Sequence, residues 1–210
     1  MKTVIISSGN IENYSRFSET AASADFVICA DGGIRHAKRM SVIPDVIIGD
    51  LDSAADEHIE YYKGKGVSFI RFDSDKDKTD TQLCLEYALD FSKEIIMLGS
   101  LGSRIDHALA NISLLKLALD RGIKACIMNE KNEIYMISDE ITIKGRPGEY
   151  ISLLPASTKA EGISISGALY ELNDAVMELG NPYGVSNEFV KEEIYIKVLK
   201  GYLLVIKASD

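Results

Sequence analysis

Cysteine is scarce in this sequence, and long apolar runs are absent from it. The 210 residues include only three cysteines, which stand far apart among apolar neighbours: Cys29, Cys84 and Cys126. This number and placement favour buried free thiols over disulfides or a cysteine-bound metal cluster. The apolar run near the amino terminus, residues 4–6, is too short for a signal peptide or a membrane span. We therefore expect a cytoplasmic protein with no membrane partner.

Basic clusters are also missing. The sequence has 32 acidic and 23 basic residues, a formal net charge of −9, and no stretch rich in lysine and arginine. Binding to nucleic acid normally requires a basic face, so we expect no nucleic-acid partner. An acidic protein binds an anionic ligand when Mg²⁺ and a few placed cations reverse the local charge. Clusters of carboxylates are therefore the first places to examine.

Hydrophobic residues make up 46% of the chain, and their pattern changes near residue 129. In residues 1–128, strand-like runs alternate with helix-like segments, which predicts a doubly wound, mostly parallel α/β domain. Residues 129–210 contain short β-rich runs separated by turn residues, which predicts an antiparallel β-sandwich or barrel. The expected strands are 3–8, 26–30, 46–48, 67–70, 94–98 and 125–128, then 134–137, 141–143, 150–154, 162–165, 193–198 and 202–206.

Two carboxylates follow the buried run Val46–Ile48. Asp50 and Asp52 come just after Gly49, and in an extended segment residues two apart point to the same side. Like charges held together cost free energy unless a cation or a proton relieves them. Because strands of open parallel sheets end at the ligand crevice, this pair is a candidate for half of a divalent-metal site. A solvated turn explains the same residues equally well.

A second acidic segment, residues 73–80, precedes a predicted helix and holds four carboxylates in eight residues. Thr79 and Gln82 have the spacing of a capping box. Acidic residues at a helix N-terminus stabilise the helix by about 0.3–1 kcal/mol each, which explains one or two of them. We interpret Asp77 and Asp80 as metal or phosphate ligands.

Two glycine-containing turns also follow predicted strands. In residues 31–33, Asp-Gly-Gly, the glycines allow a ligand to approach the backbone, although an ordinary strand-to-helix turn is the stronger explanation. Residues 99–107 form a glycine-rich loop before the predicted helix 105–120. The free N–H groups of such a loop and the planar fork of Arg104 suit phosphate oxygens. The loop lacks the Gly-Lys-Ser/Thr of a Walker motif.

The chemistry of these segments is clearest when they are taken together. At one sheet edge they would place carboxylate-bound Mg²⁺ opposite an arginine and glycine-amide cradle, which suits phosphoryl or pyrophosphoryl transfer. Taken singly, Asp106 is explained as a first-turn helix acid and His107 as a packed or solvated histidine. We find no arrangement of serine, cysteine and histidine that suggests a covalent nucleophile.

Five motifs occur in the order seen in thiamine pyrophosphokinases, and nearly the whole chain resembles that family. The motifs are residues 30–33, 49–53, 75–80, 99–107 and 184–188. The resemblance implies transfer of the pyrophosphoryl group of ATP to the hydroxyethyl oxygen of thiamine, which gives thiamine diphosphate and AMP. It also implies a homodimer in which the α/β domain holds ATP and Mg²⁺ and the partner subunit's β domain helps to hold thiamine.

Matching positions imply roles for individual residues. Metal and catalytic carboxylates would be Asp50, Asp52 and Asp80, with Asp77 as a further metal ligand. Asp80 or Asp106 would accept the hydroxyl proton. The nucleotide and phosphate motifs contribute Asp31, Gly32, Gly33, Gly99, Gly102, Arg104 and Asp106. The motif that contacts the aminopyrimidine contributes Ser186 and Asn187.

The sequence departs from the family pattern in two places. Ser103 precedes Arg104 where the family often has a second glycine, and the chain has no tryptophan to stack on thiamine. Tyr170 stands at the matching place and offers an aromatic face, although it could equally be a half-buried strand residue. Two other functions stay open: a diphosphokinase for another heterocyclic alcohol such as a hydroxymethylpterin, and a non-catalytic module that binds nucleotide or thiamine.

Overall fold

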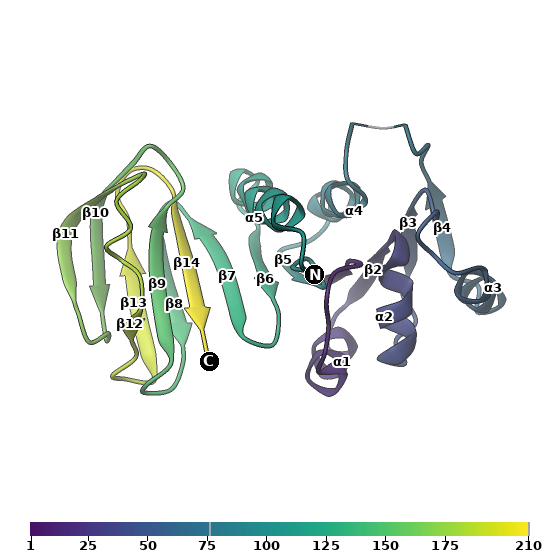
Figure 1. The fold of residues 1–210 in the computed structure, drawn as a ribbon, viewed down its shortest axis with the longest axis horizontal. Helices are drawn as coiled ribbons and strands as arrows, with labels where there is room; N and C mark the ends of the chain where they lie inside the picture. The colour runs from purple at the N-terminus through teal and green to yellow at the C-terminus, as the bar shows by residue number, and fades with distance from the viewer. Residues whose placement is uncertain (76, 210) are drawn as a thin grey trace. The chain divides into compact units, whose positions relative to one another are not determined.

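The computed structural model describes residues 1–75 and 77–209, which fall into two compact units, Met1–Glu130 and Lys131–Asp210 (Figure 1). Lys76, inside the sequence motif 75–80, lies outside the described residues. Within the described part of the chain, none of the helices combines the length and the apolar character needed to cross a membrane. Cys29, Cys84 and Cys126 are buried free thiols, as expected.

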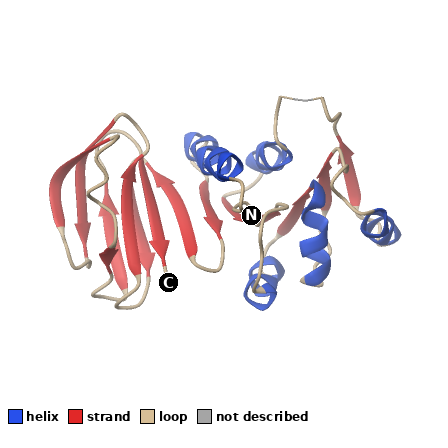
Figure 2. Ribbon diagram, viewed as in Figure 1, coloured by secondary structure: helices blue, strands red, loops and turns tan. Residues whose placement is uncertain are grey.

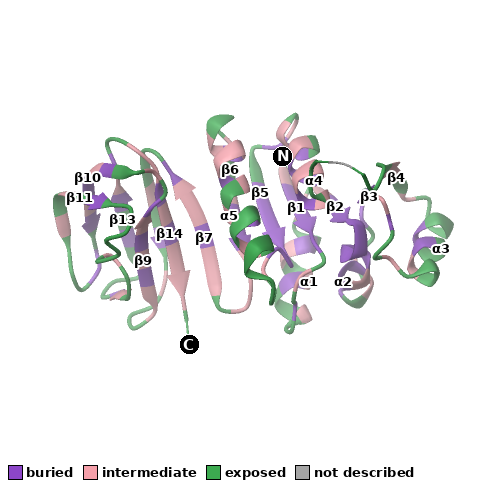
Figure 3. Cartoon of the chain, turned by 45° about the horizontal axis from the view of Figure 1, so that its top comes forward, coloured by how far each residue is buried: buried purple, intermediate pink, exposed green. Residues whose placement is uncertain are grey.

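The first unit contains one parallel sheet. Its strands lie in the order β6-β5-β1-β2-β3-β4, and every pair of neighbours among them is parallel. Figure 3 shows that the central strands are mostly buried, which explains their continuous runs of valine and isoleucine. The bounds are β1 (Lys2–Ile6), β2 (Phe26–Ala30), β3 (Val46–Gly49), β4 (Ser68–Arg71), β5 (Glu94–Leu98) and β6 (Lys124–Met128).

Helices cover both faces of this sheet (Figure 2). Strands β1 to β4 are added in one direction and β5 and β6 in the other, so right-handed crossovers place α1–α3 on one face and α4 and α5 on the opposite face. The prediction of a doubly wound α/β fold is therefore confirmed. The helices are α1 (Tyr14–Ala22), the short 3₁₀ helix η1 (Asp31–Gly33), α2 (Ile34–Arg39), α3 (Asp56–Gly64), α4 (Asp80–Leu89) and α5 (Ile105–Asp120).

Helix α4 begins as its sequence indicates, with one difference. Thr79 is the N-cap, and its Oγ1 accepts a hydrogen bond from the Gln82 N–H at 3.2 Å. The Gln82 side chain donates instead to Glu86 Oε1 at 3.0 Å. Only the threonine half of the expected capping box therefore forms, because a carboxylate one turn further along the helix attracts the Gln82 amide.

The second unit is built from two antiparallel sheets, with strand orders β12-β9-β14-β7 and β11-β10-β13-β8. Side chains from both sheets share one buried cluster, which includes Ile151, Leu153, Val205, Ile163, Ile194 and Ile196. The expected antiparallel fold is confirmed, and it is a sandwich. The strands are β7 (Asn132–Ile137), β8 (Glu140–Lys144), β9 (Tyr150–Pro155), β10 (Lys159–Ser166), β11 (Leu172–Glu178), β12 (Asn187–Glu188), β13 (Glu193–Lys197) and β14 (Leu203–Ala208).

Candidate active site

The predicted site residues of the first unit lie in the loops that follow its strands or in the first turns of the helices after those loops. Asp31 begins η1 directly after β2, Asp50 and Asp52 follow β3, and residues 99–104 join β5 to α5. Parallel strands end at one edge of the sheet, so these loops share that edge. Strand β1 has β2 on one side and β5 on the other, so the direction of strand addition reverses there. Open α/β sheets bind their ligands at such a switch point.

Three carboxylates come together over the ends of β2 and β3. One oxygen from each of Asp31, Asp50 and Asp52 lies within 4.8 Å of the other two. Asp31 is only 5% exposed, and its Oδ1 has no hydrogen-bond donor among residues 1–75 and 77–209. Three negative charges this close repel one another unless a cation or a proton compensates them. The all-oxygen ligand set fits Mg²⁺ or another hard divalent cation.

A turn brings Asp50 and Asp52 together, and the expectation of an extended segment here is wrong. Strand β3 ends at Gly49, Leu51 adopts the left-handed conformation with φ = 68°, and the Asp52 N–H donates to Asp50 Oδ1 at 3.3 Å. Asp31 is also left-handed, with φ = 42°. Such conformations cost about 1–3 kcal/mol each in residues other than glycine and cluster at functional sites. Backbone strain of this kind is therefore present in both turns that carry the three carboxylates.

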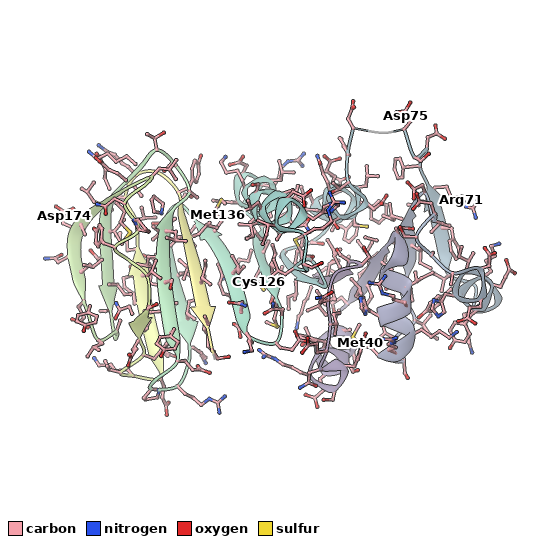
Figure 4. The ribbon with its side chains drawn as sticks, in the orientation of Figure 1. Met40, Arg71, Asp75, Cys126, Met136 and Asp174 are labelled. Atoms are coloured by element: carbon pink, nitrogen blue, oxygen red, sulfur yellow. The ribbon has the colours of Figure 1, made fainter. Side chains whose placement is uncertain are left out.

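Asp80 adjoins this cluster through Gly49. Gly49 has φ = 152°, and a Cβ atom at this position would lie 2.9 Å from the Cβ of Asp31 and 3.1 Å from Oδ1 of Asp80. Only a glycine therefore leaves room for both aspartates. Asp77, by contrast, is exposed on the loop before α4. Figure 4 labels Asp75 on the same loop. The metal roles of Asp77 and Asp80 stay predictions.

We expect Gly49→Ala to weaken metal binding as well as folding. Gly66→Ala is the matched control, because Gly66 also has a positive φ of 78° but has no atom within 4 Å of the added Cβ position. Gly66→Ala should lower the free energy of unfolding by about 1–2 kcal/mol through its left-handed backbone. Gly49→Ala should lower it further, because the added Cβ also overlaps Asp31. Only Gly49→Ala should displace Asp31 and Asp80, and so lower Mg²⁺ affinity in calorimetric titration. Equal Mg²⁺ affinity in the two variants would refute this account of Gly49.

The loop after β5 presents an arginine at a helix N-terminus. Gly99 is left-handed with φ = 62°, and Arg104 is the N-cap residue of α5. The exposed Arg104 guanidinium pairs with Asp106 through two bonds, Nη2 to Oδ2 at 2.5 Å and Nε to Oδ1 at 3.2 Å. The hydrogen bond from Arg104 lowers the pKa of Asp106 to about 2. Asp106 therefore stays ionised at neutral pH and holds the guanidinium fork in place.

Arg35 is a cation at this edge that the sequence analysis does not single out. Its guanidinium donates to the backbone oxygen of Ser8, just after β1. Its Nη1 also lies 3.4 Å from the position of a Cβ atom on Gly32, so the charge sits beside the Asp-Gly-Gly turn. Its position in the sequence, two residues after Gly33, is the one signal that links it to the Asp-Gly-Gly motif. Arg35 adds positive charge next to the acidic cluster.

The three residues predicted to bind the substrate lie together in the second unit. Asn187 Oδ1 accepts from the Tyr170 N–H at 2.9 Å, and Asn187 Nδ2 donates to the Tyr170 carbonyl at 2.7 Å. Tyr170 is 68% exposed, so it is not the half-buried strand residue that the sequence also allows. Ser186 is left-handed, with φ = 59°, and its N–H donates to Ser152 Oγ at 3.0 Å. Asn187 therefore holds the backbone that presents the exposed ring.

Two family models match the chain, one in each unit. Residues 17–127 match the thiamin pyrophosphokinase catalytic domain, and residues 138–203 match the thiamin pyrophosphokinase vitamin B1 binding domain. Each match covers most of its unit, so the resemblance does not rest on short motifs alone.

Known proteins agree with the family models. The chain is 31% identical to thiamine pyrophosphokinase of Bacillus subtilis over 172 residues, which cover 80% of each chain. It is 27% identical to thiamine pyrophosphokinase 1 of rice over 196 residues, 80% of this chain and 74% of that one. The crystal structure of the Bacillus subtilis enzyme superposes over 100% of both chains with a TM-score of 0.90 and 26% identity. The yeast thiamin pyrophosphokinase structure shares the fold, with a TM-score of 0.83 and 19% identity over 99% of this chain and 86% of that one. The chain therefore belongs to the thiamine pyrophosphokinase family.

Proposed function

We propose that this chain transfers the pyrophosphoryl group of ATP to the hydroxyethyl oxygen of thiamine, giving thiamine diphosphate and AMP. The observation that carries the proposal is the cluster of Asp31, Asp50 and Asp52. It lies at the same edge of the parallel sheet as residues 99–104, the loop that ends with Arg104. Strands β2 and β5 flank β1, so their ends are two strand spacings apart, roughly 10 Å. A triphosphate lying over β1 would meet carboxylates on one side and donors on the other.

The donor set fits a bound Mg²⁺ ion. Asp50 and Asp52 would hold it, the buried Asp31 supplies a third carboxylate oxygen, and Asp80 adjoins them through Gly49. Asp77 is a further ligand only if its exposed loop approaches the cluster. The chemistry that the ion supplies when bound is neutralisation of phosphate charge and orientation of the triphosphate.

The protein's own donors would take up the charge that develops on the transferring group. Arg104 presents a planar fork at the N-terminus of α5, held by Asp106, and the backbone amides around Gly99 and Gly102 add further donors. Gly32 and Gly33 leave the η1 turn without side chains beside the place where the triphosphate would lie. We assign these groups to nucleotide binding.

In the transfer step, the thiamine hydroxyl oxygen attacks the β-phosphorus. The bond from that phosphorus to the oxygen bridging the α-phosphorus breaks, and its electron pair leaves with AMP. The hydroxyl proton passes to a carboxylate. We assign this role to Asp80 rather than Asp106, because both carboxylate oxygens of Asp106 accept hydrogen bonds from Arg104, whereas Asp80 lies beside the acidic cluster.

We assign thiamine to the second unit. Tyr170 offers an open aromatic face, and Ser186 and Asn187 belong to the same local structure, which supports a site for a flat heterocycle. We further propose a homodimer in which the partner subunit's β unit serves the site on the first unit. Three buried free thiols support a reducing, cytoplasmic location.

ATP labelled with ³²P at the β-phosphate tests the proposed reaction and its acceptor. The label should appear in thiamine diphosphate at the phosphate next to the thiamine oxygen, with none in AMP. A parallel reaction with a hydroxymethylpterin should give no labelled product. Labelled pterin diphosphate without labelled thiamine diphosphate would move the acceptor from thiamine to a pterin.

A further inference from the structure

His36 is a buried imidazole on α2 with a hydrogen bond on each ring nitrogen. It is 3% exposed. Its Nε2 lies 2.7 Å from the backbone oxygen of Gly9, and its Nδ1 lies 2.8 Å from the hydroxyl of Tyr14 on α1. Arg39 Nη1 donates to the same hydroxyl at 3.0 Å. None of these groups has a part in the transfer step.

The partners fix where the protons lie. A carbonyl oxygen only accepts, so Nε2 carries a proton and donates it to Gly9. Burial lowers the pKa of His36, and this effect, with the nearby Arg35 and Arg39 charges, outweighs the hydrogen bond to Gly9, which raises it. The ring is therefore neutral, and Nδ1 accepts the Tyr14 proton. The chain of donors runs from Arg39 through Tyr14 and His36 and ends on Gly9.

Gly9 connects this chain to the loop after β5. The Gly9 N–H donates to the Gly99 oxygen at 2.6 Å, and the Asn10 N–H donates to the Leu101 oxygen at 2.9 Å. A Cβ atom on Gly9 would overlap both of these carbonyl oxygens, so the two loops lie in direct backbone contact. The geometry of the loop after β5 thus depends on where Gly9 is held.

We propose that His36 is a positioning residue that holds residues 7–10, and through them the loop 99–104, in the geometry that nucleotide binding requires. The inference rests on the proposed role of that loop in binding ATP. The alternative is that His36 only stabilises the fold. The two differ in one respect: a positioning role predicts a loss confined to these loops and to ATP.

Three variants separate these roles. His36→Leu removes both ring hydrogen bonds while keeping an apolar group of similar size. His36→Gln restores a donor for Gly9 and an acceptor for Tyr14. Thr3→Val is the matched control, because it removes another buried hydrogen bond of the same unit, Thr3 Oγ1 to Ser92 Oγ at 2.7 Å, at the amino end of β1. Amide hydrogen exchange of Gly9 and Asn10 and calorimetric titration with MgATP are the two measurements.

In His36→Leu we expect the Gly9 and Asn10 amides to exchange about tenfold faster and MgATP to bind about three- to tenfold more weakly. Thiamine affinity should not change. His36→Gln should recover most of both losses, and Thr3→Val should lower the melting temperature without either effect. Wild-type exchange at Gly9 and Asn10 in a folded His36→Leu protein would overturn the proposal, as would an equal ATP defect in Thr3→Val. Failure of the wild-type protein to bind MgATP would instead overturn the proposed function, and the exchange data would still decide whether His36 holds the loop.

Discussion

Replacing Asp50 or Asp52 by asparagine is expected to lower kcat by on the order of 10³-fold while the fold stays intact. The side chain keeps its size, but the cluster loses one of three negative charges and one strong ligand. A metal that stabilises transferring phosphate groups contributes several kcal/mol, and each 1.4 kcal/mol corresponds to about tenfold in rate. Steady-state AMP formation at saturating ATP and thiamine measures the effect.

Thermal melting provides the second readout for the same variants. A cation that binds only the folded protein raises its melting temperature. Added Mg²⁺ should therefore stabilise the wild-type protein and leave Asp50→Asn and Asp52→Asn nearly unaffected. Asp73→Asn, on the exposed loop before α4, is the control for loss of an acidic charge and should behave as the wild type. Wild-type turnover in either cluster variant would remove these residues from the catalytic site.

Arg104→Ala is expected to lower kcat by about 10²–10³-fold, because one fixed donor to developing charge contributes about this much. Arg104→Lys should recover only part of the loss, since an ammonium group keeps the charge but lacks the planar fork. Fixed-time assays of AMP formation at saturating ATP and thiamine compare kcat of the two variants with that of the wild type.

Asp106→Asn separates the two possible reasons for that loss. If Arg104 acts on the phosphate and Asp106 only holds it, Asp106→Asn should cost less than tenfold. If Asp106 were the proton acceptor, its replacement would be at least as damaging as Arg104→Ala. That outcome would also contradict the assignment of Asp80, whose replacement by asparagine should then be mild.

The sequence predicts the fold because each unit has its own clear pattern of apolar residues. Buried runs such as Val46–Ile48 alternate with helical segments in the first unit, which predicts the parallel sheet. Short β-rich runs separated by turn residues in the second unit predict the antiparallel fold. The sequence pattern does not predict strands β11 and β12. The first, Leu172–Glu178, has the adjacent polar residues Asn173 and Asp174, which interrupt an apolar alternation, and the second has only two residues. Pairing with β10 and β9 creates these strands, and no local signal shows it.

The sequence predicts those parts of the site whose residues are close together in the chain. It does not predict the parts that the packing of distant segments brings together. Asp50 and Asp52 are close in sequence, so their pairing was foreseen even though a left-handed Leu51 achieves it rather than a strand. Asp31 joins them only because β2 lies beside β3, a relation that the sequence does not display. His36 likewise reads as an ordinary helix residue until Gly9 is placed against it.

The most direct test of the central claim is AMP release from ATP by the purified protein, with and without thiamine, in Mg²⁺ and in EDTA. The account predicts AMP and thiamine diphosphate in equal amounts when thiamine and Mg²⁺ are both present, and neither product when one of them is withheld. AMP formation that persists in EDTA, or that is indifferent to thiamine, would contradict it.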